Sequence, residues 1–450
     1  MMPGSALKRT RTCLEAAGNL ARTNTIPDTR SERRVGRNIG LQPTSGWCDA
    51  EPPRLKPRVR RTRNSAMAAS RRRFVTDTCR AACALALLPS AGCARQNASH
   101  PDLPRNIPEY LDKRIPELLT ETKVPGLSIA VVKDSALAWR RSYGVANVET
   151  KARISDDTIF EVGSVSKTVF AYAVLKLCER GVLSLDTPLT RYSSERPLSD
   201  PRVDLITVRR VLCHTTGLPN WRSSDTPLGF AFTPGEHWSY SGEGYWYLQS
   251  VITRLLGRVD PDKCSTFEDG LRVCATDIGG YLKANVLDPL GMPSSGYLWN
   301  SDYETRAAQG HDATGNIRSP RRRASAVDAA RYAAAGGLHT TATEYVRFMI
   351  EVIDPRRSDA FRLSRQMRDE MIRPQVKVDS TSSWALGWQI FHGKFGDVIS
   401  HGGDNPGFKA FVVASVARKA GWVIFMNGDN AAPIIQALVD EKCPVNEIFA

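Results

Sequence analysis

The sequence predicts an α+β fold, in which one antiparallel sheet is built from both ends of the chain and flanked by N- and C-terminal helices. Alternating apolar patterns mark strands at residues 126–132 and 137–141, and such patterns return only from residue 397. Helical patterns and proline-rich loops fill the interval, so we expect a large all-helical subdomain to be inserted over about residues 168–390. With 450 residues, 42% of them hydrophobic, the chain can bury a large core, which excludes collagen-like and wholly disordered classes.

Each expected element follows from its local pattern. Apolar residues at helical spacing predict an amphipathic helix over residues 107–119. Lys133-Asp134-Ser135 separates the first two strands and is typical of a hairpin turn. An apolar run predicts a helix over residues 168–178. Near the C-terminus we expect strands at residues 397–401, 408–416 and 422–427, followed by a helix over residues 432–439.

The positive charge of the chain lies almost entirely at its N-terminus. The net charge is +14, but residues 1–80 hold 18 Lys and Arg against six Asp and Glu, so 12 of these charges lie there. A nucleic-acid-binding domain keeps its basic stripe on a folded surface, whereas this basic segment shows no helical or strand periodicity. We therefore expect no nucleic-acid partner.

Residues 67–93 have the order of an export signal: arginines first, then an apolar stretch, then small residues. Arg72 and Arg73 before Phe74 resemble a twin-arginine signal, and the segment ending at Cys93 resembles a lipoprotein cleavage box, although Ser90 stands where an aliphatic residue is usual. We expect residues 1–66 to be a disordered basic leader or an over-extended reading frame, residues 94–450 to be the globular domain, and the protein to reach the periplasm or outer envelope, with Cys93 as a candidate lipid anchor.

Ser164 and Lys167 are three residues apart at the start of the apolar helix. At a first helical turn this spacing puts the hydroxyl and the amine on one face, and the helix N-terminus favours an anion nearby. A serine becomes a nucleophile when a base takes its proton, and a lysine whose burial favours the neutral form can be that base. Taken alone, the spacing equally fits a helix cap at Ser164 beside an exposed lysine.

Two further motifs follow in order. Tyr240 lies in a loop that opens a helix, and His401-Gly402-Gly403-Asp404 ends a strand. A serine-lysine pair, a tyrosine and a basic strand motif in this order resemble the serine β-lactamase and penicillin-binding protein superfamily, closest to its class C and esterase-like branch. The resemblance covers residues 107–440, implies a β-lactamase/transpeptidase-like fold, and includes four further landmarks at residues 124–126, 143–147, 213–219 and 335–341.

Carried over residue by residue, the resemblance implies that Ser164 is the acyl-accepting nucleophile, Lys167 its general base and Tyr240 the proton shuttle. An adjacent ammonium would favour the phenolate form of the tyrosine. The backbone N–H groups of Ser164 and Asp404 would form the oxyanion hole. His401, Gly402, Gly403 and Gly242 are the expected substrate-binding residues.

Two residues depart from the family pattern. His401 stands where many relatives carry lysine. Lysine would supply a fixed positive charge, whereas the charge of a histidine depends on pH. Gly242 stands where relatives usually carry an asparagine that binds both the lysine and the acyl side chain of the substrate. Both departures favour esters or other neutral acyl substrates over β-lactams and amide-bearing peptides.

The sequence thus predicts an exported serine hydrolase that acts on a small-molecule or peptide acyl substrate through an acyl-enzyme, with ester substrates favoured. A β-lactamase or D-alanyl-D-alanine carboxypeptidase is the alternative, and a non-catalytic envelope-binding protein is the alternative of another class. We expect no metal and no cofactor. The oligomeric state and a disulfide between Cys264 and Cys274 are left open.

Overall fold

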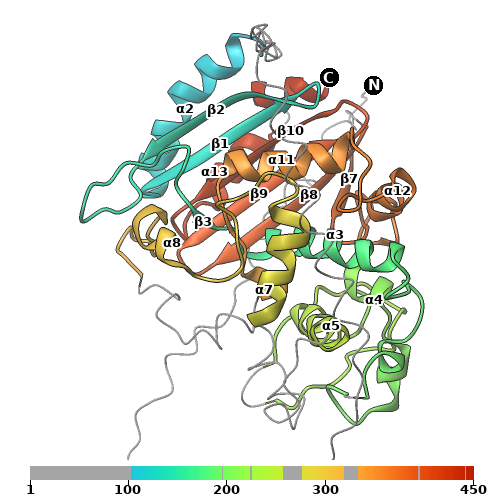
Figure 1. Ribbon diagram of the computed structural model, residues 1–450. Coiled ribbons are helices and arrows are strands. Elements are labelled where there is room, and N and C mark those ends of the chain that lie inside the picture. Colours follow the sequence, from blue (N-terminus) through green and yellow to red (C-terminus); the bar gives the residue numbers. More distant parts are fainter. Residues whose placement is uncertain are drawn as a thin grey trace, which may run out of the picture. The chain divides into compact units, whose positions relative to one another are not determined.

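The structure, a computed structural model, describes residues 103–450 except residues 195, 223–225, 257–275, 319–332, 394–395 and 441. The expected leader, the export signal and the Cys264–Cys274 pair lie outside the described residues. At the centre is an eight-stranded antiparallel sheet in the order β2-β1-β10-β9-β8-β7-β6-β5 (Figure 1). Its strands are β1 (Gly126–Lys133), β2 (Ala136–Gly144), β5 (Val376–Lys377), β6 (Ser382–Trp384), β7 (Gln389–Gly393), β8 (Gly396–Asn405), β9 (Phe408–Ser415) and β10 (Ala420–Met426).

The two ends of the chain meet inside this sheet. β1 pairs with β10 over the register from Leu127↔Met426 to Val132↔Gly421, so the N-terminal hairpin is joined directly to the C-terminal strands. The turn between β1 and β2 places Asp134 and Ser135 at φ values of 51° and 56°. Two successive residues with positive φ are typical of a tight hairpin turn whose twist matches that of the strands.

Helices from the two termini cover one face of the sheet. They are α2 (Asn106–Thr122), α13 (Ala432–Val439) and a final 3₁₀ segment (Pro444–Phe449). Alternate residues of β1, such as Leu127 and Ile129, are fully buried against Ile107 and Leu111 of α2. The pattern arises because successive side chains of a strand point to opposite faces.

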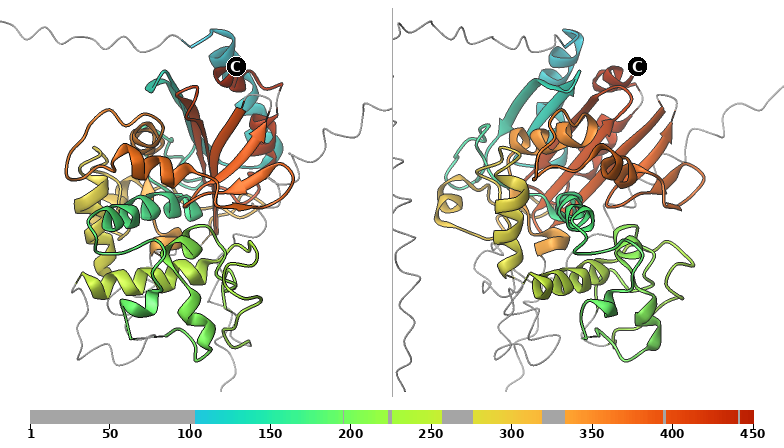
Figure 2. Two further views of the ribbon diagram at one scale, coloured as in Figure 1. Left: turned by 90° about the vertical axis from the view of Figure 1, so that its right-hand side faces the viewer. Right: turned by 45° about the vertical axis from the view of Figure 1, so that its right-hand side comes forward.

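The opposite face is covered by α11 (Ala342–Ile353), which packs on β1 and β10. α3 (Ser166–Glu179) lies beside α11, with Thr168 Oγ1 2.9 Å from the Tyr345 hydroxyl, and both helices belong to the long segment between the two groups of strands. α3 is buried almost all round, because the rest of the helical part packs on its other side (Figure 2). The remaining helices and short strands are η2 (Leu189–Arg191), η3 (Pro201–Leu205), α4 (Val208–Leu212), α5 (Gly242–Leu255), α7 (Thr276–Leu282) with a π-helical turn (Lys283–Leu287), α8 (Ser301–Arg306), α10 (Ala333–Gly336), α12 (Arg365–Ile372), and the pair β3 (Phe160–Glu161) and β4 (His339–Thr340).

The predicted fold class is confirmed, but the expected limits of the helical insertion are wrong. The sheet resumes at β5 (residue 376), well before residue 390, and α11 packs on the sheet rather than in a separate subdomain. β5, β6 and β7 are two, three and five residues long, too short for a readable alternation. The helix over residues 432–439 has the predicted bounds. In the described part of the chain, every helix is too short or too polar to cross a bilayer.

Candidate active site

Ser164 lies in a single 3₁₀ turn, Gly163–Val165, that leads directly into α3. Gly163 adopts a φ of +50°, and a Cβ atom there would lie 2.6 Å from the backbone nitrogen of Asp404. Glycine is therefore required both by the left-handed conformation and by the close approach of this turn to β8. The Ser164 side chain is 5% exposed, so the fold holds its hydroxyl beside the end of β8.

Lys167 is fully buried in the first turn of α3. Its Nζ lies 3.0 Å from Ser164 Oγ and donates a hydrogen bond to the carbonyl oxygen of Ala335 at 2.6 Å. Burial lowers the pKa of Lys167 well below its ordinary value of 10.5. A neutral amine keeps a lone pair that can accept a proton. Lys167 therefore has both the position and the protonation state that a base for the Ser164 hydroxyl needs.

Tyr240 comes two residues before α5, and its ring centroid lies 5.0 Å from Lys167 Nζ. Its hydroxyl is buried, and among the described residues it forms no hydrogen bond. Burial raises the pKa of Tyr240 above 10, and the nearby Ser164 hydroxyl opposes this only in part. The expected phenolate is therefore wrong for the resting site, because burial disfavours the charged form of this hydroxyl. Tyr240 rests as a phenol that can donate its proton.

The expected oxyanion-hole amides belong to two backbone segments in close contact. A Cβ atom on Gly403 would lie 2.0 Å from the carbonyl oxygen of Val162, so the Ser164 turn packs directly on the backbone of β8. The Asp404 side chain is buried and accepts a hydrogen bond from Lys409 Nζ at 2.7 Å. Burial raises the pKa of Asp404, and the Lys409 ammonium opposes that shift. This ion pair anchors the residue whose amide would face the reacting oxygen.

His401 is fully buried on β8, and its Nδ1 lies 2.7 Å from the carbonyl oxygen of Gly402. A carbonyl only accepts hydrogen bonds, so Nδ1 carries the hydrogen and Nε2 is an acceptor that no described residue donates to. Burial lowers the pKa of His401 to about 3. The predicted pH-dependent positive charge is therefore wrong, since this imidazole is neutral throughout the physiological range.

Gly242 begins α5, and the room that a side chain would need there is already filled. A Cβ atom would lie 2.6 Å from the Asn220 carbonyl oxygen and 2.6 Å from the Trp221 indole. The Gly242 amide donates to that same carbonyl oxygen at 2.9 Å and to Asn220 Oδ1 at 3.1 Å. Asn220 and Trp221, which sequence reasoning did not single out for the site, thus fill the space next to the Gly242 Cα atom.

We expect Gly242→Ala to lower the free energy of unfolding by about 1–3 kcal/mol, because the added methyl meets backbone as well as an indole ring. Thermal or urea unfolding of the two proteins measures this difference. Gly280→Ala is the matched control, since no atom of the described residues lies within 4 Å of a Cβ atom there. Equal stability of Gly242→Ala and the parent would contradict the packing described.

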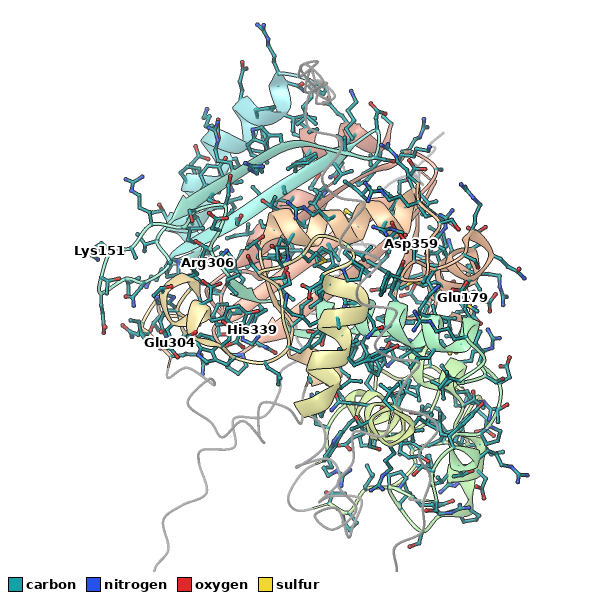
Figure 3. All side chains as sticks on the ribbon, in the orientation of Figure 1. Lys151, Glu179, Glu304, Arg306, His339 and Asp359 are labelled. Carbon is teal, nitrogen blue, oxygen red and sulfur yellow. The ribbon has the colours of Figure 1, made fainter. Side chains whose placement is uncertain are left out.

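His339, three residues after the end of α10, is half-buried and packs against α8. Its ring stacks on Tyr303 of α8 with centroids 5.3 Å apart, and Figure 3 labels His339 together with Glu304 and Arg306 of that helix. Nδ1 contacts the carbonyl oxygen of Gly337 at 3.0 Å. These contacts give His339 a structural role. Within the described residues, His, Cys, Asp and Glu side chains form no group of three that could hold a metal ion.

Two solved structures share this architecture. The octameric penicillin-binding protein homologue from Pyrococcus abyssi superposes with a TM-score of 0.60 at 24% identity, covering 75% of this chain and 78% of that one. D-alanine carboxypeptidase AmpC from Burkholderia cenocepacia gives a TM-score of 0.60 at 18% identity, covering 74% and 97%. At these identities the likeness shows the fold.

Curated relatives are similar over part of their length. Esterase EstB of Burkholderia gladioli is 29% identical over 234 residues, which are 45% of this chain and 54% of the esterase. Protein flp of Staphylococcus aureus (strain N315) is 21% identical over 338 residues, which are 71% of this chain and 63% of that protein. The chain therefore spans about half to two thirds of the length of these two relatives.

The family model, the fold and these relatives together place the chain in the β-lactamase and penicillin-binding protein superfamily. The Beta-lactamase family model matches residues 111–438, which include the whole sheet and the helical part. The chain belongs to the Beta-lactamase family.

Proposed function

We propose that this protein is an esterase that works through a two-step acyl-enzyme mechanism. The observation that carries the proposal is the 3.0 Å contact between Ser164 Oγ and the buried Nζ of Lys167. Burial favours the neutral amine, which is the form that can remove the serine proton. The Tyr240 phenol beside this pair supplies a second group that can transfer a proton.

Acylation follows from these positions. Ser164 Oγ attacks the ester carbonyl while its proton passes to Lys167 Nζ, and the carbonyl oxygen becomes an oxyanion held by the amides of Ser164 and Asp404. When the intermediate collapses, the bond to the leaving oxygen breaks and Tyr240 donates its proton to that oxygen. Lys167 returns a proton to Tyr240, so both groups end neutral and the acyl group is attached to Ser164.

Deacylation uses the same groups in reverse. A water molecule attacks the acyl carbonyl, its proton passes to the Tyr240 oxygen, and the Tyr240 proton passes to Lys167. Collapse of the second oxyanion breaks the bond to Ser164 Oγ, which takes its proton back from Lys167. The products are a carboxylic acid and the regenerated enzyme, and no other reactant is needed.

Two features of the site support ester substrates. His401 is neutral, so the position where relatives carry lysine offers no cation to a substrate carboxylate. Gly242 offers no side-chain amide to an amide-bearing substrate, and Asn220 and Trp221 fill the space beside it. An alkoxide also leaves with less help from an acid than an amine does, which suits a single buried phenol. The esterase among the relatives agrees with this choice.

The proposal is tested by assaying the full chain beside Ser164→Ala on a short-chain aryl ester, a chromogenic cephalosporin and a D-alanyl-D-alanine peptide. Ester turnover that is lost in the variant is the expected result. Faster turnover of the cephalosporin or the peptide would replace the proposal by a β-lactamase or carboxypeptidase function. Binding of all three without turnover by either protein would favour a non-catalytic envelope-binding protein.

The neutrality of His401 has a measurable consequence. We expect KM for an ester that bears a carboxylate to show no imidazole titration between pH 5 and pH 8, because the pKa of His401 lies at about 3. His401→Lys should lower that KM about tenfold relative to a neutral ester, since a charge-assisted hydrogen bond contributes roughly 1.5–3 kcal/mol. His401→Gln, which keeps an acceptor, is the matched control. A parent KM that rises between pH 6 and pH 7 would show that the ring carries charge.

We also propose that the protein is exported, on the basis of the arginines, apolar stretch and small residues between residues 67 and 93. Fractionation of cells expressing the full chain, followed by N-terminal sequencing of the mature protein, tests this placement.

A further inference from the structure

His214 holds the backbone on both sides of Tyr240. The His214 carbonyl oxygen accepts a hydrogen bond from the Ser239 amide at 2.8 Å, and its Nδ1 accepts one from the Ser241 amide at 3.0 Å. The His214 ring also lies against the Tyr240 ring, with centroids 4.1 Å apart and planes inclined by 30°. One residue therefore fixes both neighbours of Tyr240 and one face of its ring.

An unusual backbone conformation makes this double contact possible. His214 follows α4 and adopts a φ of +59°, in the left-handed region that residues other than glycine rarely enter. It is fully buried, and the Thr215 amide after it returns to the carbonyl oxygen of Arg210 at 2.9 Å. Such a conformation persists when its surroundings enforce it, and it is enriched at functional sites. Here it places the His214 carbonyl oxygen and the His214 Nδ1 against the same loop, residues 239–241.

The hydrogen bond to Ser241 also fixes the tautomer of His214. An amide N–H only donates, so Nδ1 must be unprotonated and Nε2 carries the hydrogen. Burial lowers the pKa of His214 well below 6.5. The ring is therefore neutral, and its acceptor stays available to the Ser241 amide.

Tyr240 needs such support because its hydroxyl forms no hydrogen bond among the described residues. The Ser164 hydroxyl is only near enough to oppose part of the rise in its pKa, and Trp384 meets its ring edge-on with centroids 5.7 Å apart. The place of the phenol oxygen relative to Lys167 and Ser164 is thus set largely by the backbone at residues 239 and 241. A shift of about 1 Å in a catalytic group can cost roughly 100-fold in rate.

We propose that His214 is a positioning residue that sets the reach of the Tyr240 phenol, acting through its carbonyl oxygen and Nδ1 on the two residues that flank Tyr240. The inference rests on the proposed function, in which Tyr240 protonates the leaving group. His214 itself transfers no proton in this scheme.

The test compares two amides of different reach. His214→Asn places its amide oxygen near the position of Nδ1, whereas His214→Gln places the same amide one bond further out and leaves the Ser241 amide without its acceptor. Both variants of the full chain are assayed on an activated nitrophenyl ester and on an alkyl ester of the same acid. We expect kcat of His214→Asn to stay within about threefold of the parent, and kcat of His214→Gln to fall roughly 10- to 100-fold on the alkyl ester.

The leaving group separates positioning from a merely structural role. A nitrophenolate leaves with little protonation, so His214→Gln should lose far less on the nitrophenyl ester than on the alkyl ester, with KM little changed. In a Tyr240→Phe background His214→Gln should add almost no further loss, because the two residues act as one unit. Equal losses on both esters, or full additivity with Tyr240→Phe, would overturn the inference.

Folding and activity controls distinguish a loss of positioning from a loss of folding and from a failure of the proposed function. Thermal unfolding is measured for every variant, and His214→Phe, which keeps a ring but lacks the acceptor, replaces His214→Gln if the latter does not fold. High kcat of His214→Phe on the alkyl ester would assign the effect to ring stacking and contradict the inference. A parent that hydrolyses neither ester would instead contradict the proposed function.

Discussion

Replacing Ser164 with alanine is expected to abolish ester turnover and leave the fold intact. The change removes only Oγ from a side chain that is already buried, so no cavity larger than one atom is formed. Without that oxygen there is no acceptor for the acyl group, and Lys167 and Tyr240 lose the proton on which they act. Because such residues act as a unit, we expect kcat to fall by roughly 10⁴- to 10⁶-fold.

Ser250→Ala is the matched control for this experiment. Ser250 is also buried, but it lies on α5, and its hydroxyl donates to the Tyr247 carbonyl oxygen within the same helix. We expect this variant to keep the activity of the parent. Circular dichroism and thermal unfolding establish that all three proteins are folded. Retained turnover in folded Ser164→Ala would remove the basis for the whole catalytic scheme.

Lys167→Met is expected to lower kcat by about 10²- to 10⁴-fold, the usual contribution of a general base. Methionine fills a similar volume in this fully buried position but cannot accept the Ser164 proton. It also leaves the Ala335 carbonyl oxygen without its donor, at a cost of about 1–3 kcal/mol in the free energy of unfolding. Lys176→Met, on the same helix and half-buried beside Glu179, is the control for loss of a lysine from α3.

The pH dependence of stability tests whether Lys167 is neutral in the folded protein. Because its pKa is lowered on folding, the unfolded chain binds one more proton than the native state between the lowered pKa and about 10.5. Stability of the parent therefore rises with pH in that window, by about 1.4 kcal/mol per pH unit from this group. Lys167→Met lacks this contribution. The free energy of unfolding of the parent minus that of the variant should therefore increase by about 1.4 kcal/mol per pH unit.

Urea unfolding of both proteins at pH 7, 8 and 9 measures the difference, and the effects of all other titrating groups cancel in the comparison. A difference that is the same at the three pH values would mean that Lys167 is protonated in the native state. Lys167 could not then be the base that the scheme requires.

Much of the fold could be predicted because its elements have strong local patterns. β1, β9 and β10 are largely apolar strands of seven or eight residues that are buried almost throughout, and α13 was predicted with its observed bounds. β5, β6 and β7 take their structure from successive pairing, β5 with β6, β6 with β7 and β7 with β8, rather than from their own sequence. Local patterns could not reveal them.

The features of the site divide in the same way, into those that local sequence predicts and those that depend on tertiary contacts. Ser164 and Lys167 are neighbours on one helical turn, so their contact follows from sequence spacing. The charge of His401 does not, because it depends on burial by residues remote in the chain. The filling of the Gly242 position by Asn220 and Trp221 and the hold of His214 on Tyr240 are also tertiary contacts. A histidine 26 residues before the tyrosine gives no sequence signal of that role.

Covalent labelling of the full chain with a fluorophosphonate, followed by intact-mass measurement and peptide mapping, tests most directly whether Ser164 is the nucleophile. We expect one adduct per chain, located on Ser164, and no adduct in Ser164→Ala. Labelling should also slow strongly in Lys167→Met, since the reagent needs the activated hydroxyl. An unlabelled parent, or an adduct on another residue that persists in Ser164→Ala, would contradict the assignment of Ser164 as the nucleophile.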